Sequence, residues 1–91
     1  MTKNEGRLIF FTGSECPHCH DSLPLIAKLE KEEKIKIITL EVWHDAKNAS
    51  ILEKIDNGKC GGVPFFYNTK TKKWLCGSCD YPIFKKWALG K

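Results

Sequence analysis

Apolar and polar positions alternate along the chain in segments that predict strands and helices. Residues 7–12 form a continuous apolar run, which is typical of an interior strand covered on both faces. From Pro17 to Glu33, apolar residues recur at helical spacing, and Pro24 should bend this helix near its second turn. Residues 35–43 are rich in β-branched side chains. We therefore expect a strand, a long helix and a second strand in the first half.

The second half predicts shorter elements. A helix is expected over residues 47–55, with Ile51, Leu52 and Ile55 facing inward and Asn57-Gly58 ending it. Residues 65–67 and 73–76 are strand-like, and the turn-forming residues between them predict a hairpin.

A last helix should follow Asp80, a residue type that caps helix N-termini, with Pro82 in its first turn. A right-handed crossover would make the first two strands parallel. The order β-α-β-α-β-β-α predicts an α/β protein with a four-stranded mixed sheet and helices on its faces.

Size and charge limit the possible functions. The 91 residues suffice for one small domain, residues 1–91, and an apolar content of 42% favours a folded globule. The net charge of +4 is mild and lysines alternate with glutamates, so we expect no nucleic-acid partner. The polar start and the lack of a run of ~20 apolar residues predict a cytoplasmic monomer with no membrane partner.

The sequence Cys16-Pro17-His18-Cys19 carries the clearest chemistry. Standing disulfides are uncommon in the cytosol, so a C-x-x-C pair there is expected to be catalytic or metal-binding. With Cys16 at the helix N-cap and Pro17 in the first turn, the Cys16 sulfur can accept the free N–H of Cys19. The helix dipole and His18 would add positive charge. We expect Cys16 to be the nucleophile and Cys19 the resolving thiol.

The remaining cysteines allow other interpretations. Cys16, Cys19, Cys76 and Cys79 could supply the four ligands of a structural zinc, although the two pairs lie much further apart than in zinc ribbons. Cys76 and Cys79 could also form a second redox pair, bind metal, or be two packed thiols. Cys60 is expected to be a small buried apolar residue.

Taken together, strand, C-P-x-C at a helix start, Gly-Val-Pro before a hairpin, and a final helix resemble the thioredoxin superfamily. Gly77-Ser78-Cys79-Asp80 is similar to the G-G-C-D loop of glutaredoxins. The resemblance implies a thioredoxin-like fold in which Pro64 is a cis-proline beside the active cysteines. It also implies that Gly62, Val63 and Pro64 contact substrate, and that Asp80 lies in a loop near the site.

Two positions depart from the glutaredoxin pattern. Gly13 stands where glutaredoxins commonly have a lysine, and Tyr81 follows Asp80 where they have a second acid. The leading hypothesis is an oxidoreductase of disulfide-containing proteins that needs no cofactor and is reduced by glutathione or by an unidentified reductase. The alternatives are a glutathione-dependent glutaredoxin and a zinc-binding interaction module on the same scaffold.

Overall fold

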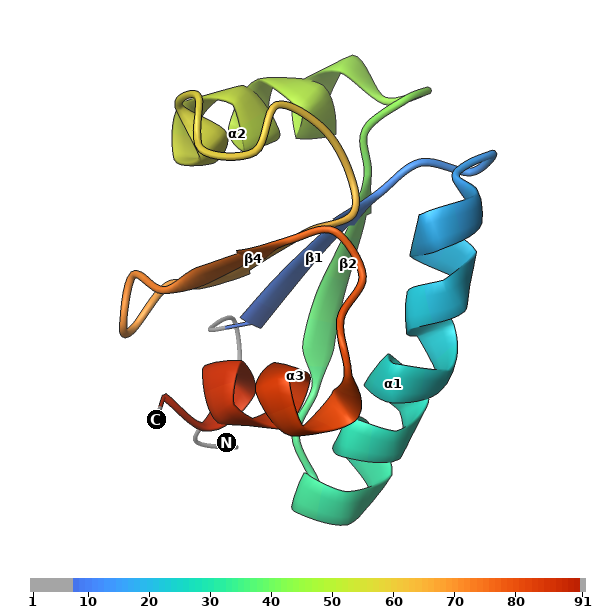
Figure 1. The fold of residues 1–91 in the computed structure, drawn as a ribbon. Helices are drawn as coiled ribbons and strands as arrows, with labels where there is room; N and C mark the ends of the chain where they lie inside the picture. Colours follow the sequence, from blue (N-terminus) through green and yellow to red (C-terminus); the bar gives the residue numbers. More distant parts are fainter. Residues whose placement is uncertain (1–7, 91) are drawn as a thin grey trace.

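The computed structural model describes residues 8–90, and their elements follow the predicted order (Figure 1). The apolar and polar pattern therefore identified each of the elements found there. They are β1 (Leu8–Thr12), α1 (Pro17–Glu33), β2 (Ile37–Glu41), α2 (Ala46–Asp56), β3 (Phe65–Asn68), β4 (Trp74–Cys76) and α3 (Tyr81–Leu89).

The strands form one mixed sheet in the order β2-β1-β3-β4. β1 runs parallel to β2 and antiparallel to β3, and β3 and β4 form the predicted hairpin. The continuous apolar run of β1 is explained by this position, because an interior strand is covered by neighbours on both edges and by helices on both faces.

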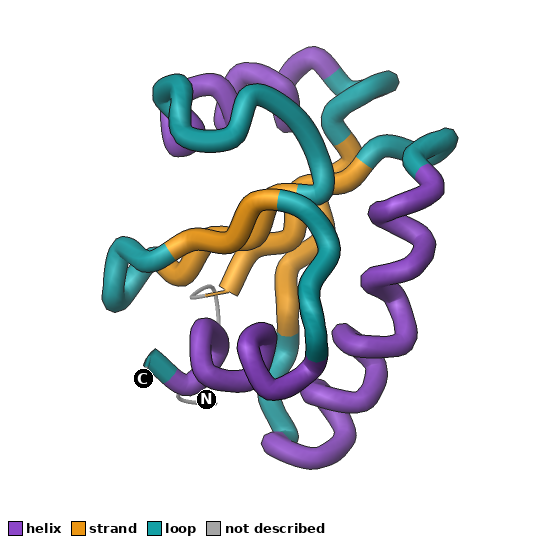
Figure 2. The backbone as a smooth tube through the Cα atoms, in the orientation of Figure 1, coloured by secondary structure: helices purple, strands orange, loops and turns teal. Residues whose placement is uncertain are grey.

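The helices cover both faces of the sheet (Figures 1 and 2). Neighbouring residues of a strand point to opposite faces, so Phe10 and Phe66 pack with α1 and α3, whereas Phe11 and Phe65 pack with α2. The rings of Phe10 and Phe66 stack with centroids 4.9 Å apart. This double-sided core fixes the helix α1, and with it the C-x-x-C motif, against the sheet.

Some boundaries differ from those predicted. β2 is shorter than residues 35–43, because its only partner among the described strands is β1, whose five residues pair with Ile37–Glu41. Ile51 was expected to face inward, but it is 37% exposed. Helix α2 packs against the sheet through Ala49, Leu52 and Ile55, and Ile51 lies outside this apolar face of the helix. Residue 7 of the first predicted strand lies outside the described residues.

Among residues 8–90, no helix combines the length and the apolar character needed to cross a membrane.

Candidate active site

Cys16 lies at the N-cap of α1, as predicted. Its sulfur accepts a hydrogen bond from the backbone N–H of Cys19 at 3.2 Å, and Pro17 occupies the first turn. The first N–H groups of a helix have no partner within the helix, and the helix dipole is positive at this end. Both effects stabilise negative charge on the Cys16 sulfur. Cys16 is only 4% exposed, so its sulfur is largely shielded from solvent.

Cys19 lies beneath Cys16 in the same helical turn. Its side chain is 1% exposed and belongs to the core cluster that α1 and α3 form with the sheet. Burial raises the pKa of the Cys19 thiol, and the neighbouring Cys16 thiol raises it further. The Cys19 thiol is therefore harder to ionise than an exposed cysteine, whereas the Cys16 sulfur accepts a backbone N–H. The two sulfurs of the motif thus occupy different environments.

The loop before β3 faces this pair. The peptide bond between Val63 and Pro64 is cis, and the Cys16 sulfur lies 3.9 Å from the Val63 carbonyl oxygen. Pro64 is buried, whereas Gly62 is exposed and Val63 is half-buried. The resemblance implied that these three residues contact substrate, and the structure places the Val63 carbonyl oxygen close to the Cys16 sulfur.

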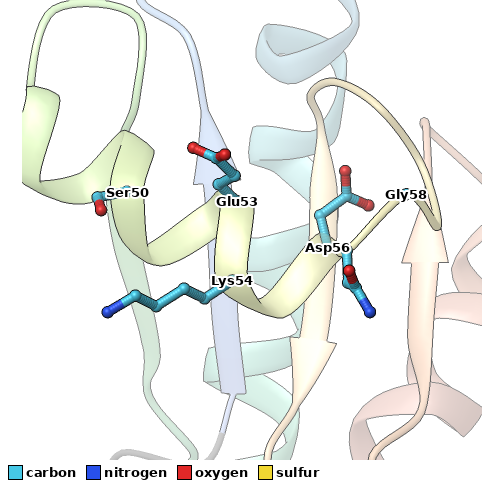
Figure 3. A pocket seen from close by; sticks show the side chains of 6 residues that line it. Ser50, Glu53, Lys54, Asp56 and Gly58 are labelled. Atoms are coloured by element: carbon cyan, nitrogen blue, oxygen red, sulfur yellow. The ribbon is translucent and has the colours of Figure 1, made fainter.

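A buried carboxylate organises the same loop. Asp56, at the end of α2, is 8% exposed and accepts the backbone N–H groups of Cys60 at 2.5 Å and Gly61 at 2.9 Å. Asp56 also lines a surface hollow of about 540 Å³ together with exposed Glu53 (Figure 3). No periodicity or motif in the sequence singled out Asp56, because its partners are backbone groups of an irregular loop.

The chain shares its architecture with a known protein. The structure of a glutaredoxin from Archaeoglobus fulgidus matches it with a TM-score of 0.63, over 89% of this chain and 84% of that one. The chain has a glutaredoxin-like fold. The two sequences are 18% identical. No protein-family model matches the sequence, and no curated protein matches it either. The likeness therefore establishes the thioredoxin-like fold, and function has to be argued from the site.

The second cysteine pair is not the one predicted. Cys76 forms a disulfide with Cys60, and Cys79 is a free, partly buried thiol. Cys60 was expected to be a small buried apolar residue; it is partly buried and packs against the cluster around Phe11 and Phe65, but its sulfur is bonded to Cys76. Cys60 lies just before β3 and Cys76 ends β4, which pairs with β3, so the glutaredoxin-like hairpin brings them together. The C-x-x-C spacing suggested Cys79 as the partner of Cys76, because spacing along the chain does not take the pairing of β3 with β4 into account.

The disulfide also bears on the zinc alternative. A tetrahedral site built from Cys16, Cys19, Cys76 and Cys79 needs four free thiolates. Cys76 is bonded to Cys60 in this structure and cannot be one of them. Within residues 8–90, no group of three or more His, Cys, Asp or Glu side chains is arranged to hold a metal ion.

His18 and Asp80, unlike Cys16 and Cys19, are not buried in the core. His18 is exposed on the first turn of α1, and its backbone carbonyl accepts the hydroxyl of Ser22 at 3.1 Å. Asp80 occupies the N-cap of α3 as predicted, but its side chain makes no capping hydrogen bond. Its carboxylate contributes to the raised pKa of the Cys79 thiol, for which burial is the larger cause.

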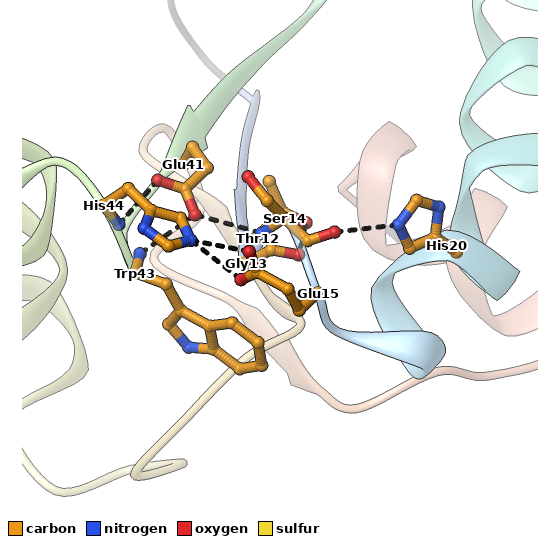
Figure 4. Close-up of polar contacts among 8 residues, drawn as sticks. All are labelled: Thr12, Gly13, Ser14, Glu15, His20, Glu41, Trp43 and His44. Carbon is orange, nitrogen blue, oxygen red and sulfur yellow. Dashed lines mark hydrogen bonds and ion pairs between the residues drawn. The ribbon is translucent and has the colours of Figure 1, made fainter.

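A polar cluster next to the motif was not predicted (Figure 4). The Glu41 carboxylate accepts the backbone N–H groups of Ser14 at 3.0 Å, Trp43 at 3.2 Å and His44 at 2.8 Å. Desolvation acts to raise the pKa of Glu41, but these hydrogen bonds outweigh it and hold the pKa below its ordinary value. Glu41 thereby joins the loop after β2 to the loop that precedes Cys16.

The cluster contains a second link between the same loops. His44 Nε2 lies 2.8 Å from the Glu15 carboxylate, and this contact raises the pKa of His44. One signal in the sequence could have indicated the cluster. The carboxyl ends of parallel strands meet at one edge of a sheet, so residues just after β1 and β2 had to be neighbours.

Proposed function

We propose that this protein reduces disulfide bonds in other proteins through the Cys16–Cys19 dithiol. The observation that carries the proposal is the position of Cys16. Its sulfur lies at the N-cap of α1, 3.2 Å from the N–H of Cys19, so negative charge on the sulfur is stabilised before any substrate arrives. An attacking thiol must be a thiolate, and the groups that face this sulfur, a backbone N–H and the positive end of a helix dipole, are ones that bind an anion.

The reaction proceeds in two exchanges. The Cys16 thiolate attacks one sulfur of the substrate disulfide, forms a mixed disulfide with it, and expels the other substrate sulfur as a thiolate that takes up a proton. Cys19 then loses its proton and attacks the Cys16 sulfur. This step forms the Cys16–Cys19 disulfide and releases the second substrate thiol. The substrate gains two electrons from the enzyme dithiol and two protons, one given up by Cys19 and one taken from solvent, which replaces the proton that Cys16 lost on becoming a thiolate.

The environment of Cys19 suits its place in this order. A raised pKa keeps the Cys19 thiol protonated, so that it does not compete with Cys16 for the incoming disulfide. Its burial directly beneath Cys16 leaves the Cys16 sulfur of the mixed disulfide as its target. Val63, whose carbonyl oxygen faces Cys16, would pair through its backbone with the extended substrate.

Turnover requires a thiol or dithiol reductant to return Cys16 and Cys19 to the reduced state. Glutathione or a protein dithiol would serve, and the exchange needs no metal or bound cofactor. His18, exposed beside the pair, would add positive charge near the substrate when it is protonated.

Reduction of insulin disulfides with dithiothreitol as the reductant tests the proposal. We expect the wild-type protein to accelerate the reaction and Cys16→Ser to abolish the acceleration. Cys19→Ser should accumulate a covalent mixed disulfide, visible by mass spectrometry under non-reducing conditions. Cys79→Ser is the matched control, because it removes another partly buried thiol outside the motif. Acceleration that survives Cys16→Ser would show that another group carries the reaction.

A further inference from the structure

Trp43 occupies an unusual place for a large apolar side chain. It follows β2 and is 51% exposed, yet it lies against the loop that leads to Cys16. A Cβ added at Gly13 would fall 2.3 to 2.7 Å from three atoms of the indole ring. Gly13 is linked to the nucleophile directly, because its carbonyl oxygen accepts the N–H of Cys16 at 3.1 Å. The ring thus lies against the residue that binds the Cys16 N–H, and it is exposed to solvent.

The backbone that carries the ring is held in place. The backbone N–H of Trp43 donates to the Glu41 carboxylate. The same carboxylate accepts the backbone N–H of Ser14, in the loop that leads to Cys16. The contact between His44 and Glu15 joins the same two loops a second time. Binding on a surface that is already ordered costs little conformational entropy. The backbone that carries the ring is therefore ordered before a substrate binds (Figure 4).

The charges around the ring distinguish two classes of disulfide. Glutathione is a small tripeptide with two carboxylates, so a site that binds it well needs cations. Any side chain at Gly13 would collide with the indole, so no lysine or arginine fits there. The charged side chains that join these loops are the carboxylate of Glu15, which pairs with the His44 imidazole, and the carboxylate of Glu41 at the end of β2, so carboxylates outnumber the one imidazole among them. An indole surface instead favours contact with the apolar side chains that a polypeptide can carry next to its cysteine.

We propose that Trp43 is a substrate-contacting residue that selects disulfides carried by polypeptide chains over glutathione disulfide. The inference rests on the proposed function, since it assigns a substrate class to the Cys16 site. In this arrangement the substrate segment lies extended between the Val63 backbone and the Trp43 ring. The side chain next to the substrate cysteine packs on the indole while the cysteine sulfur reaches Cys16.

Single-turnover oxidation of the reduced protein tests this inference without an added reductant. The Cys16–Cys19 dithiol is oxidised either by a disulfide-linked peptide dimer with leucine beside each cysteine or by glutathione disulfide. The remaining dithiol is measured by acid quenching and mass spectrometry. Varying the peptide concentration separates the half-saturating concentration from the maximal rate.

We expect Trp43→Ala to raise the half-saturating peptide concentration about tenfold with little change in maximal rate. The ratio of peptide to glutathione-disulfide rate constants should fall by a similar factor. Trp43→Phe should restore most of the selectivity, which a role in folding alone does not predict, and it also covers the case in which Trp43→Ala does not fold. Trp74→Ala is the control, because Trp74 is a 39% exposed tryptophan on β4.

Two results would overturn the inference, and they differ from a failure of the proposed function. Equal losses toward both disulfides would mean that Trp43 does not select between them. An unchanged half-saturating concentration in Trp43→Ala would mean that it does not contact the peptide. If the wild-type dithiol reacts with neither disulfide, the proposed function itself is wrong.

Discussion

Cys60, in the loop that leads to the cis peptide bond before Pro64, is joined by a disulfide to Cys76 at the end of β4. The bond ties the loop that faces Cys16 to the hairpin, independently of the Cys16–Cys19 pair. Because the two cysteines are 16 residues apart, the bond restricts the unfolded chain as well as the folded one.

Removing this disulfide should lower stability without removing the dithiol chemistry. Closing a loop of this length stabilises a fold by about 3 kcal/mol in the chain-entropy account. We expect Cys60→Ser/Cys76→Ser to lose a comparable amount in urea unfolding of the oxidised protein. Cys79→Ser, which leaves the bond intact, is the control. An unchanged unfolding midpoint, or peptide mapping that links Cys76 to Cys79, would contradict the pairing.

Asp56 holds the same loop through the backbone of Cys60 and Gly61. Its two carboxylate oxygens each accept a backbone N–H, so Asp56→Asn replaces one acceptor with a donor that faces a donor. Leaving such a buried group unsatisfied costs about 1–3 kcal/mol. We expect a loss of this size in chemical denaturation, together with slower insulin reduction as the Val63 loop loosens. Glu53→Gln, on the exposed side of the same hollow, should change neither (Figure 3). Equal effects of the two substitutions would exclude a specific role for Asp56.

The sequence predicted the fold well because its strongest signals are local. The apolar run of β1, the helical spacing of α1 and the turn before β4 each specify one element through neighbouring residues. The C-x-x-C motif was equally local: the N-cap position of Cys16 and its hydrogen bond from Cys19 both follow from where α1 begins. These features are encoded within a few residues and need no knowledge of distant partners.

The other parts of the site depend on residues far apart in the chain. Cys60 meets Cys76 only because β3 and β4 pair, and Ser14 meets Glu41 only because β1 and β2 lie parallel. Trp43 contacts Gly13 through the same pairing of strands. Topology could have indicated that these loops are neighbours, but not which side chains meet, since this depends on register and loop conformation.

The contact between Gly13 and Trp43 predicts strong coupling between the two positions. Gly13→Ala places a methyl group inside the present position of the ring, so the indole or the active-site loop must move. We expect Gly13→Ala to destabilise the protein and Trp43→Ala to relieve most of that loss. A double-mutant cycle in urea should give a coupling energy within the usual range of about 0.5–3 kcal/mol for contacting residues. Additive effects of the two substitutions would show that the ring does not rest on Gly13 in solution.

The His44–Glu15 contact should appear as a pH-dependent link between the two active-site loops. The hydrogen bond and charge of Glu15 raise the pKa of His44 above its ordinary value of 6.5, with a further contribution from Glu41. Since the folded-state pKa is the higher one, the stabilisation is complete below pH 6.5 and is lost as the pH rises through the folded-state pKa. An NMR titration of the His44 ring should have its midpoint above 6.5 in the wild type, and Glu15→Gln should lower that midpoint. Glu53→Gln, which removes a carboxylate on α2 instead, should leave the midpoint in place. A midpoint that does not respond to Glu15→Gln would mean that the His44–Glu15 ion pair does not form. The two loops would then be joined through Glu41 alone among these contacts.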